Sequence, residues 1–138
     1  MMIKDVMNKN IISIDLNTTP IKAFEKMYKN GVRRLFVLDE NKNPQGVVSY
    51  SDLIGAFNSL DTNLTKENPK NTKELEISEI MSPNIMTIEG KENINDAANL
   101  MLRADVSGLL VLDNKVPTGV ITKTDICRLV AANFLVEK

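Results

Sequence analysis

Two copies of one short pattern carry the polar groups that are best placed for chemistry. Ser49 lies three residues before Asp52, and Thr122 lies three residues before Asp125. This spacing is typical of a capping box, in which each side chain accepts a hydrogen bond from the other residue's backbone N–H at a helix start. The same hydroxyls, beside the free N–H groups of a helix start, could instead donate to a phosphate. The sequence leaves both interpretations open.

Two adjacent arginines, Arg33 and Arg34, have Ser107 and Gly108 as their counterparts in the second half of the chain. A pair of guanidinium groups can grip a phosphate bidentately, and arginine does this better than lysine. The alternative is an exposed edge with two solvated charges. If the arginines bind a ligand, their site prefers a phosphorylated one, whereas the site with Ser107 suits a ligand without phosphate, or none.

The residue types that are missing exclude much of enzymology. The chain has no histidine and one cysteine, Cys127, which removes histidine acid–base chemistry, Ser-His triads and Cys- or His-rich metal sites within one chain. The chain has neither a P-loop nor an evident carboxylate pair, so a nucleotide hydrolase is not indicated. We therefore predict no enzyme, no catalytic residue, no catalytic cofactor and no metal ligand. Cys127 lies in an apolar helical stretch, where we expect a buried thiol.

Charge and composition indicate an ordinary globular protein. The formal net charge is −1 and aromatic residues make up 4%, which disfavours a nucleic-acid partner because phosphates need a clustered basic face and bases need aromatic platforms. No apolar run approaches the roughly 20 residues that cross a bilayer, and the N-terminus does not read as a signal peptide. We expect a cytoplasmic protein without a membrane partner.

The chain contains an internal repeat. With a shift of 74 residues, and of 73 after a one-residue gap in a turn, sixteen positions are identical between the halves. Among them, Val37-Leu38-Asp39 returns as Val111-Leu112-Asp113. This is a duplicated unit, and two units of such small size are expected to pack on each other.

The sequence pattern of each repeat predicts the element order β-α-β-β-α. The first strand is expected at Ile11–Ile14 and Ile85–Ile88, and the first helix of repeat one is expected between the Thr18-Thr19-Pro20 start and a stop at Gly31. Apolar residues at helical spacing form one stripe on each first helix; they are Ala23, Phe24, Met27 and Tyr28, repeated as Ala97, Ala98, Met101 and Leu102. The last helices are expected to begin near Ser51 and Thr124.

The domain organisation predicted from this pattern is repeat one at residues 1–57, a polar linker at 58–76 and repeat two at 77–138. The linker prediction rests on nineteen residues with little apolar content. The fold class is α+β, with the two β-α-β-β-α repeats packed as a sandwich with pseudo-two-fold symmetry.

The motifs resemble those of the CBS domain family. The family marks are a Val-X-X-Leu-X-Val-Leu-Asp strand, a proline in the next turn, and Gly-h-h-[Ser/Thr]-X-X-Asp, where h is aliphatic. They stand here as Val32–Asp39 with Gly46–Asp52, and as Val106–Asp113 with Gly119–Asp125. The resemblance covers nearly the whole chain apart from the linker.

The resemblance implies a tandem CBS pair, or Bateman module, that acts as a stand-alone regulatory sensor. Such pairs bind AMP, ADP, ATP, S-adenosylmethionine, methylthioadenosine or related ligands in clefts between the repeats, signal by a conformational change and often form homodimers. The implied partners are therefore an adenosyl ligand, a second copy and an unidentified target protein. The alternative is a protein-interaction or dimerisation scaffold that binds no ligand.

The resemblance also implies which residues line the two clefts. Asp52 and Asp125 would each accept hydrogen bonds from both ribose hydroxyls, since a carboxylate offers two acceptor oxygens to a vicinal diol. Simple core packing is the alternative for every apolar wall residue. One cleft combines Thr122 and Asp125 with Met7, Ile12, Val32 and Arg33, with Arg34 beside them; the other combines Ser49 and Asp52 with Met81, Met86, Val106 and Ser107.

Overall fold

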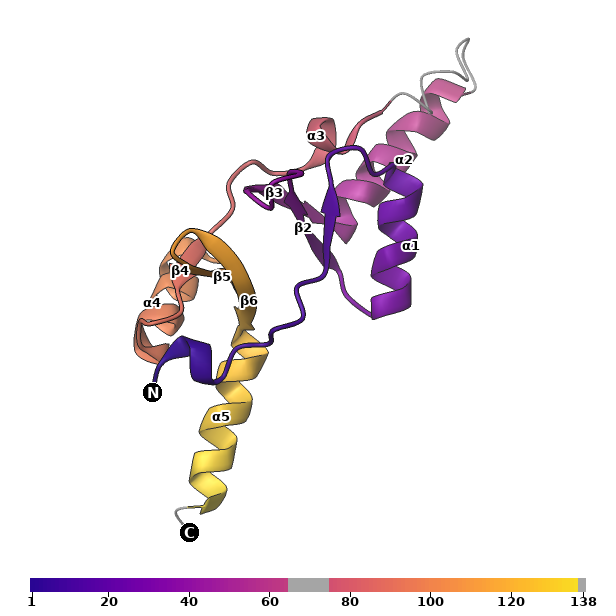
Figure 1. Ribbon diagram of the computed structural model, residues 1–138. Helices are drawn as coiled ribbons and strands as arrows, with labels where there is room; N and C mark the ends of the chain where they lie inside the picture. Colours follow the sequence, from indigo (N-terminus) through magenta and orange to yellow (C-terminus); the bar gives the residue numbers. More distant parts are fainter. Residues whose placement is uncertain (65–74, 137–138) are drawn as a thin grey trace. The chain divides into compact units, whose positions relative to one another are not determined.

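The computed structural model describes residues 1–64 and 75–136, which form two compact units (Figure 1). The first-repeat unit is Ile12–Asn84. The second-repeat unit combines Met1–Ile11 with Ile85–Lys138. The compact units in space are therefore composed differently from the repeats in the sequence.

The first-repeat unit is a three-stranded sheet with helices. Its elements are β1 (Ser13–Asp15), α1 (Pro20–Asn30), β2 (Arg34–Leu38), β3 (Pro44–Ser49), α2 (Tyr50–Leu64) and α3 (Ile77–Ile80). The strand order is β1-β2-β3, with β1 parallel and β3 antiparallel to β2. Helices α1 and α2 lie side by side in Figure 1.

The second-repeat unit has the same order of elements after a short opening helix. These are η1 (Ile3–Asp5), β4 (Thr87–Glu89), α4 (Ile94–Ala104), β5 (Gly108–Asp113), β6 (Val116–Thr122) and α5 (Lys123–Val136). Its strand order, β4-β5-β6, repeats the parallel and antiparallel pairing of the first sheet. The predicted α+β class and the β-α-β-β-α order are confirmed.

Each unit has an aliphatic core between one face of its sheet and its helices. Alternate strand residues point to the same face, so Leu35 and Val37 of β2 face inward together with Val48 of β3, and all three are fully buried. Ala23 and Met27 complete this core from α1. The second core repeats the pattern with Leu109, Val111, Ile121, Ala97 and Met101.

The opening segment of each repeat packs on the unit of the other repeat. Ile3 is fully buried in the core of the second-repeat unit, and Ile77 is fully buried in the core of the first-repeat unit. Asn8 exchanges two backbone hydrogen bonds with Val120 of β6, at 2.9 and 2.8 Å, and Ser82 exchanges two with Val47 of β3, at 2.8 and 2.9 Å. The two units are thus completed in the same way, each by a segment distant in the sequence.

The first helix of each repeat ends in a left-handed residue, which is Gly31 in α1 and Asp105 in α4, with φ of 63° and 54°. The start of α1 is also as predicted, because the Thr19 side chain accepts a hydrogen bond from the Lys22 N–H and Pro20 is the first helical residue. The predicted boundaries of α1 are confirmed.

A left-handed helix end favours glycine because a Cβ is strained there. Gly31→Ala is expected to lower the free energy of unfolding by about 1 kcal/mol. Asp105→Gly is expected to change it by at most about 0.5 kcal/mol upward, because the added freedom of the unfolded chain offsets part of the gain. Urea unfolding of both variants checks this; equal losses for the two changes would contradict it.

Some sequence predictions were wrong in detail. The first strands begin two residues later than predicted, at Ser13 and Thr87, although the Ile12 and Met86 carbonyls already accept hydrogen bonds from the central strands. Helix α2 continues to Leu64 through the start of the predicted linker, since helix propagation adds a hydrogen bond per residue. The linker residues 65–74 lie outside the described residues.

The predicted apolar stripes are only partly buried, and the predicted burial of Cys127 was wrong. Tyr28 is 85% exposed and Leu102 is 71% exposed, because the inward face of each helix is already filled one position earlier by Met27 and Met101. Cys127 is exposed. Its neighbour Ile126 packs on the core, and the next position along a helix is turned away by about 100°.

None of the helices in the described part of the chain combines the length and the apolar character that a bilayer span requires.

Candidate ligand-binding residues at the starts of α2 and α5

The start of α2 is closed by a capping box. The Ser49 N–H donates to Asp52 Oδ2 at 2.9 Å, and the Asp52 N–H donates to Ser49 Oγ at 3.0 Å. Both side chains are half-buried. The strand β3 ends at Ser49 and the helix begins at the next residue, so the pair stands at the strand-to-helix junction.

The start of α5 repeats this geometry. The Thr122 N–H donates to Asp125 Oδ2 at 2.9 Å, and the Asp125 N–H donates to Thr122 Oγ1 at 3.1 Å. The capping interpretation is therefore confirmed at both sites. It uses only one oxygen of each carboxylate, and within the described residues Oδ1 of Asp52 and Oδ1 of Asp125 accept no hydrogen bond. One acceptor oxygen of each half-buried aspartate thus remains available, one at each helix start.

Arg34 lies next to the first of these sites. It is the cross-strand partner of Ser49 in the β2–β3 pair, and directly opposite residues share a face of the sheet with Cβ atoms about 5 Å apart. The corresponding pair in the second-repeat unit is Gly108 and Thr122. The sheet therefore places an arginine opposite Ser49 and a glycine opposite Thr122.

Arg33 stacks on an aromatic residue whose role the sequence did not indicate. Its guanidinium carbon lies 5.2 Å from the centre of the Tyr50 ring, and its carbonyl accepts a hydrogen bond from the Tyr50 N–H at 2.8 Å. The Tyr50 ring packs in turn on Phe24, with 5.8 Å between centroids. A cation above an aromatic face is attracted to it, so Tyr50 restrains Arg33. The motif does not specify an aromatic residue at this position, since its counterpart in the second repeat is Lys123.

The predicted apolar residues pack against the cores of their units. Ile12, Val32 and Met81 do so in the first-repeat unit, and Met7, Met86 and Val106 in the second. All six are half-buried. Ser107 is exposed, and its carbonyl accepts a hydrogen bond from the Lys123 N–H.

Two methionines of the opening segments, Met7 and Met81, pack against the strands that end at the capping boxes. Met81 packs against Gly46 of β3, and Met7 packs against Gly119 of β6. The structure therefore brings Met81 to the sheet of Ser49 and Asp52, and Met7 to the sheet of Thr122 and Asp125. Their contact with a ligand stays a prediction, as does every grouping that joins residues of both units.

No group of three or more His, Cys, Asp or Glu side chains in the described ranges is arranged to hold a metal ion.

The repeated fold and the paired strand-to-helix caps define a tandem-repeat α+β protein. The family model for the CBS domain matches residues 3–59 and 77–132. The chain therefore belongs to the CBS domain family, and its two matches make it a CBS pair.

A relative and two solved structures illustrate the similarity. A CBS domain-containing protein of Dictyostelium discoideum is 33% identical over 129 residues, which cover 91% of this chain and 88% of that protein. A CBS domain pair solved with 5′-methylthioadenosine and S-adenosyl-L-methionine is 25% identical, with a TM-score of 0.77, over 96% of this chain and 98% of that one. CBSX2, solved with AMP, is also 25% identical at a TM-score of 0.77, over 99% and 98% of the two chains.

Several other curated relatives are longer proteins. The chain spans 31% of one and 23% of another, and the latter is named as an enzyme, L-aspartate semialdehyde sulfurtransferase. CBS domain pairs are generally regulatory modules rather than catalytic ones.

Proposed function

We propose that this CBS pair is a cytoplasmic regulatory sensor without catalytic activity that binds an adenosyl ligand. The ligand is AMP, ADP, ATP, S-adenosylmethionine or methylthioadenosine. The observation that carries the proposal is the unused carboxylate oxygen of the half-buried Asp52 and Asp125, each held at a helix start by the cap. The AMP, S-adenosylmethionine and methylthioadenosine complexes of similar CBS proteins support the same ligand class.

The cap orients each carboxylate for a ribose. Oδ2 is held by a backbone N–H, which fixes the side-chain rotamer and leaves Oδ1 directed elsewhere. A carboxylate oxygen can accept more than one hydrogen bond, so a vicinal diol can donate to Oδ1 and share Oδ2. Capping and ribose binding are therefore compatible in one side chain.

The arginines provide a way to distinguish phosphorylated from unphosphorylated ligands. Arg33 and Arg34 are both exposed at the start of β2, where phosphate oxygens could accept charge-assisted hydrogen bonds. The second repeat has a serine and a glycine at these positions. Loss of both arginines would therefore weaken the binding of AMP or ATP more than the binding of methylthioadenosine, which has no phosphate.

Regulation requires only that the ligand bind one arrangement of the protein better than another. A ligand that does so shifts the population toward that arrangement and changes the surface that a second copy or a target protein meets. A homodimer and one target protein are the partners in this proposal.

The decisive experiment compares Asp→Asn variants in a thermal-shift panel of the five ligands. Asparagine keeps one oxygen to accept the Ser49 or Thr122 N–H but loses the second acceptor and the charge. Asp52→Asn or Asp125→Asn is therefore expected to weaken the responding ligand at least about tenfold, because hydrogen bonds to charged groups contribute about 1.5–3 kcal/mol. Binding to the folded state raises its apparent stability, so the ligand-induced rise in melting temperature should fall.

Asp96→Asn is the matched control. Asp96 accepts the Asn93 N–H at 3.2 Å in the capping box of α4, away from any predicted ligand contact. Its ligand response should equal that of the wild type. An undiminished response in both Asp52→Asn and Asp125→Asn would contradict ribose binding by these residues, and no response of the wild type to any ligand would favour the ligand-free scaffold.

A further inference from the structure

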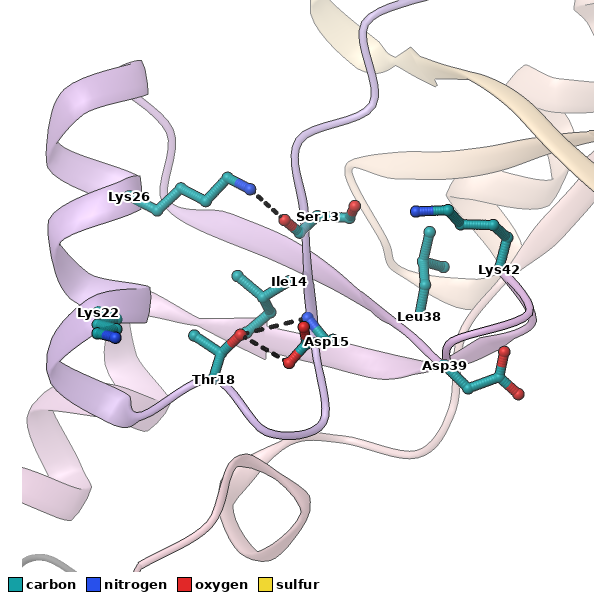
Figure 2. A pocket seen from close by; sticks show the side chains of 9 residues that line it. All are labelled: Ser13, Ile14, Asp15, Thr18, Lys22, Lys26, Leu38, Asp39 and Lys42. Atoms are coloured by element: carbon teal, nitrogen blue, oxygen red, sulfur yellow. Dashed lines mark hydrogen bonds between the residues drawn. The ribbon is translucent and has the colours of Figure 1, made fainter.

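A polar hollow of about 340 Å³ lies on the first-repeat unit, away from the α2 cap. It is formed by β1, the β1–α1 loop, α1, the end of β2 and the β2–β3 turn (Figure 2). Its lining residues are Ser13, Ile14, Asp15, Thr18, Lys22, Lys26, Leu38, Asp39 and Lys42. Arg34 and Ser49 pair at one end of β2, whereas Leu38 is at the other, about 13 Å away at 3.3 Å per residue.

Three lysines reach this hollow from two sides. Lys22 and Lys26 stand one turn apart on α1, and Lys42 stands in the β2–β3 turn with a φ of 68°. Figure 2 shows Lys26 and Lys42 extending toward β1 from opposite sides. Lys26 donates a hydrogen bond to the Ser13 carbonyl. Neither Lys22 nor Lys42 has a side-chain hydrogen bond or an ion pair with any residue that the structure describes.

The two carboxylates of the hollow accept hydrogen bonds from residues of the turns in which they lie. Asp39 accepts the N–H groups of Asn41 and Asn43, each at 2.8 Å, and the side-chain amides of Asn43 and Gln45, each at 3.3 Å. The hydrogen bonds from Asn43 and Asn41 lower the pKa of Asp39; the Asn43 N–H has the largest effect, and desolvation opposes it in part. In Figure 2 its carboxylate points away from the lysines.

Asp15 is partly occupied in the same way. Its Oδ1 accepts the Asn17 N–H at 2.9 Å and the Thr18 hydroxyl at 3.2 Å. Its Oδ2 accepts no hydrogen bond from the rest of the described chain. The hollow therefore presents unpaired ammonium groups together with one free carboxylate oxygen and the Ser13 hydroxyl.

Lys22 and Lys26 are a property of this repeat rather than of the fold, whereas Lys42 has a counterpart in Lys115, which has a φ of 71°. The residues of α4 that correspond to Lys22 and Lys26 are Asp96 and Leu100. The same backbone therefore forms in the second repeat without this positive charge, so the element geometry does not require the two lysines.

We propose that this hollow is a second ligand site, which takes a small phosphorylated molecule with free hydroxyl groups. The ammonium groups of Lys22, Lys26 and Lys42 bind the phosphate as point charges. The free Asp15 oxygen and the Ser13 hydroxyl hydrogen-bond the hydroxyls of the ligand. A volume near 340 Å³ is at the lower end of the range for small-molecule pockets, which matches a phosphorylated polyol in size.

The test is a titration of the ¹⁵N-labelled full chain, followed by backbone amide chemical shifts, with glycerol 3-phosphate, inorganic phosphate and glycerol. Glycerol 3-phosphate is expected to shift the amides of Ser13, Lys22 and Lys42. Inorganic phosphate should bind the same place more weakly and glycerol should not bind. The double variant Lys22→Gln/Lys26→Gln should weaken glycerol 3-phosphate about fivefold or more, from the loss of two exposed charge contacts.

Lys29→Gln is the control, because Lys29 is exposed on the same helix and does not line the hollow. Equal weakening by this change, or shifts confined to other parts of the chain, would overturn the site. Equal affinity for phosphate and glycerol 3-phosphate would overturn the hydroxyl contacts. Adenosyl binding in the double variant should match the wild type, so failure here is distinguishable from failure of the sensor function.

Discussion

Replacing Ile3 by alanine is expected to destabilise the second-repeat unit by about 2–5 kcal/mol, the range for removing a buried aliphatic side chain. Ile3 belongs to the first repeat in the sequence, yet it is fully buried among Leu109, Val111 and their neighbours. The loss should therefore appear as faster hydrogen exchange at β5 and β6, with β2 and β3 much less affected.

Ile77→Ala is the reciprocal substitution in the second repeat. Ile77 occupies the equivalent position in the second repeat and is fully buried in the core of the first-repeat unit. Its replacement should accelerate exchange at β2 and β3 first. If either alanine loosens the sheet of its own sequence repeat before the other sheet, the assignment of the opening segments is contradicted.

Gly119→Ala is expected to cost about 2–4 kcal/mol, from overpacking and from the loss of two backbone hydrogen bonds. A Cβ at Gly119 would lie 2.8 Å from the Asn8 carbonyl oxygen and 2.6 Å from Met7 Sδ. The sulfur can move, but the carbonyl belongs to the segment that pairs with Val120. The segment must therefore shift, which would also displace Met7 from the strand that leads to Thr122.

Gly46→Ala should have a similar effect on the first-repeat unit, because its Cβ would lie 2.4 Å from the Ser82 carbonyl oxygen. Gly55→Ala is the control. Among the described residues, and apart from its chain neighbours and the backbone of its own helix, no atom lies within 4 Å of a Cβ at Gly55, which is inside α2. Alanine should therefore stabilise the helix by about 0.5–1 kcal/mol. Urea unfolding measures all three; a neutral effect at Gly119 and Gly46 would show that the opening segments are held loosely.

The local elements were predictable because they depend on neighbours in the sequence. The turn from Gly31 to Val32, the cap at Thr19 and the boxes at Ser49 and Thr122 each need only residues within one or two helical turns. The β-rich apolar runs Leu35–Leu38 and Leu109–Leu112 likewise indicated strands. The exposure of Tyr28 and Cys127 was not predictable in this way, because amphipathic spacing gives the direction of a helix face but not how much of the face the sheet covers.

The candidate site was predicted only in part for the same reason. Spacing identified Asp52 and Asp125 as capping residues, and the family resemblance added a ribose contact. The stacking of Arg33 on Tyr50 depends on how the start of β2 meets the start of α2. The lysine hollow likewise joins residues of α1 with the turn after β2, and no sequence period links them.

The sequence by itself determined that this chain is a duplicated α+β protein of the CBS type, with a capped helix start in each repeat. Repetition and short-range spacing suffice for that, since local hydrogen bonds and apolar periods are properties of contiguous residues. Only the tertiary structure decided that Ile3 and Ile77 complete the units of the opposite repeats. Both repeats have equivalent sheets and equivalent opening segments. The sequence pattern therefore allows each opening segment to pack on the sheet of its own repeat or on that of the other repeat. Chain connectivity and side-chain packing select the second arrangement.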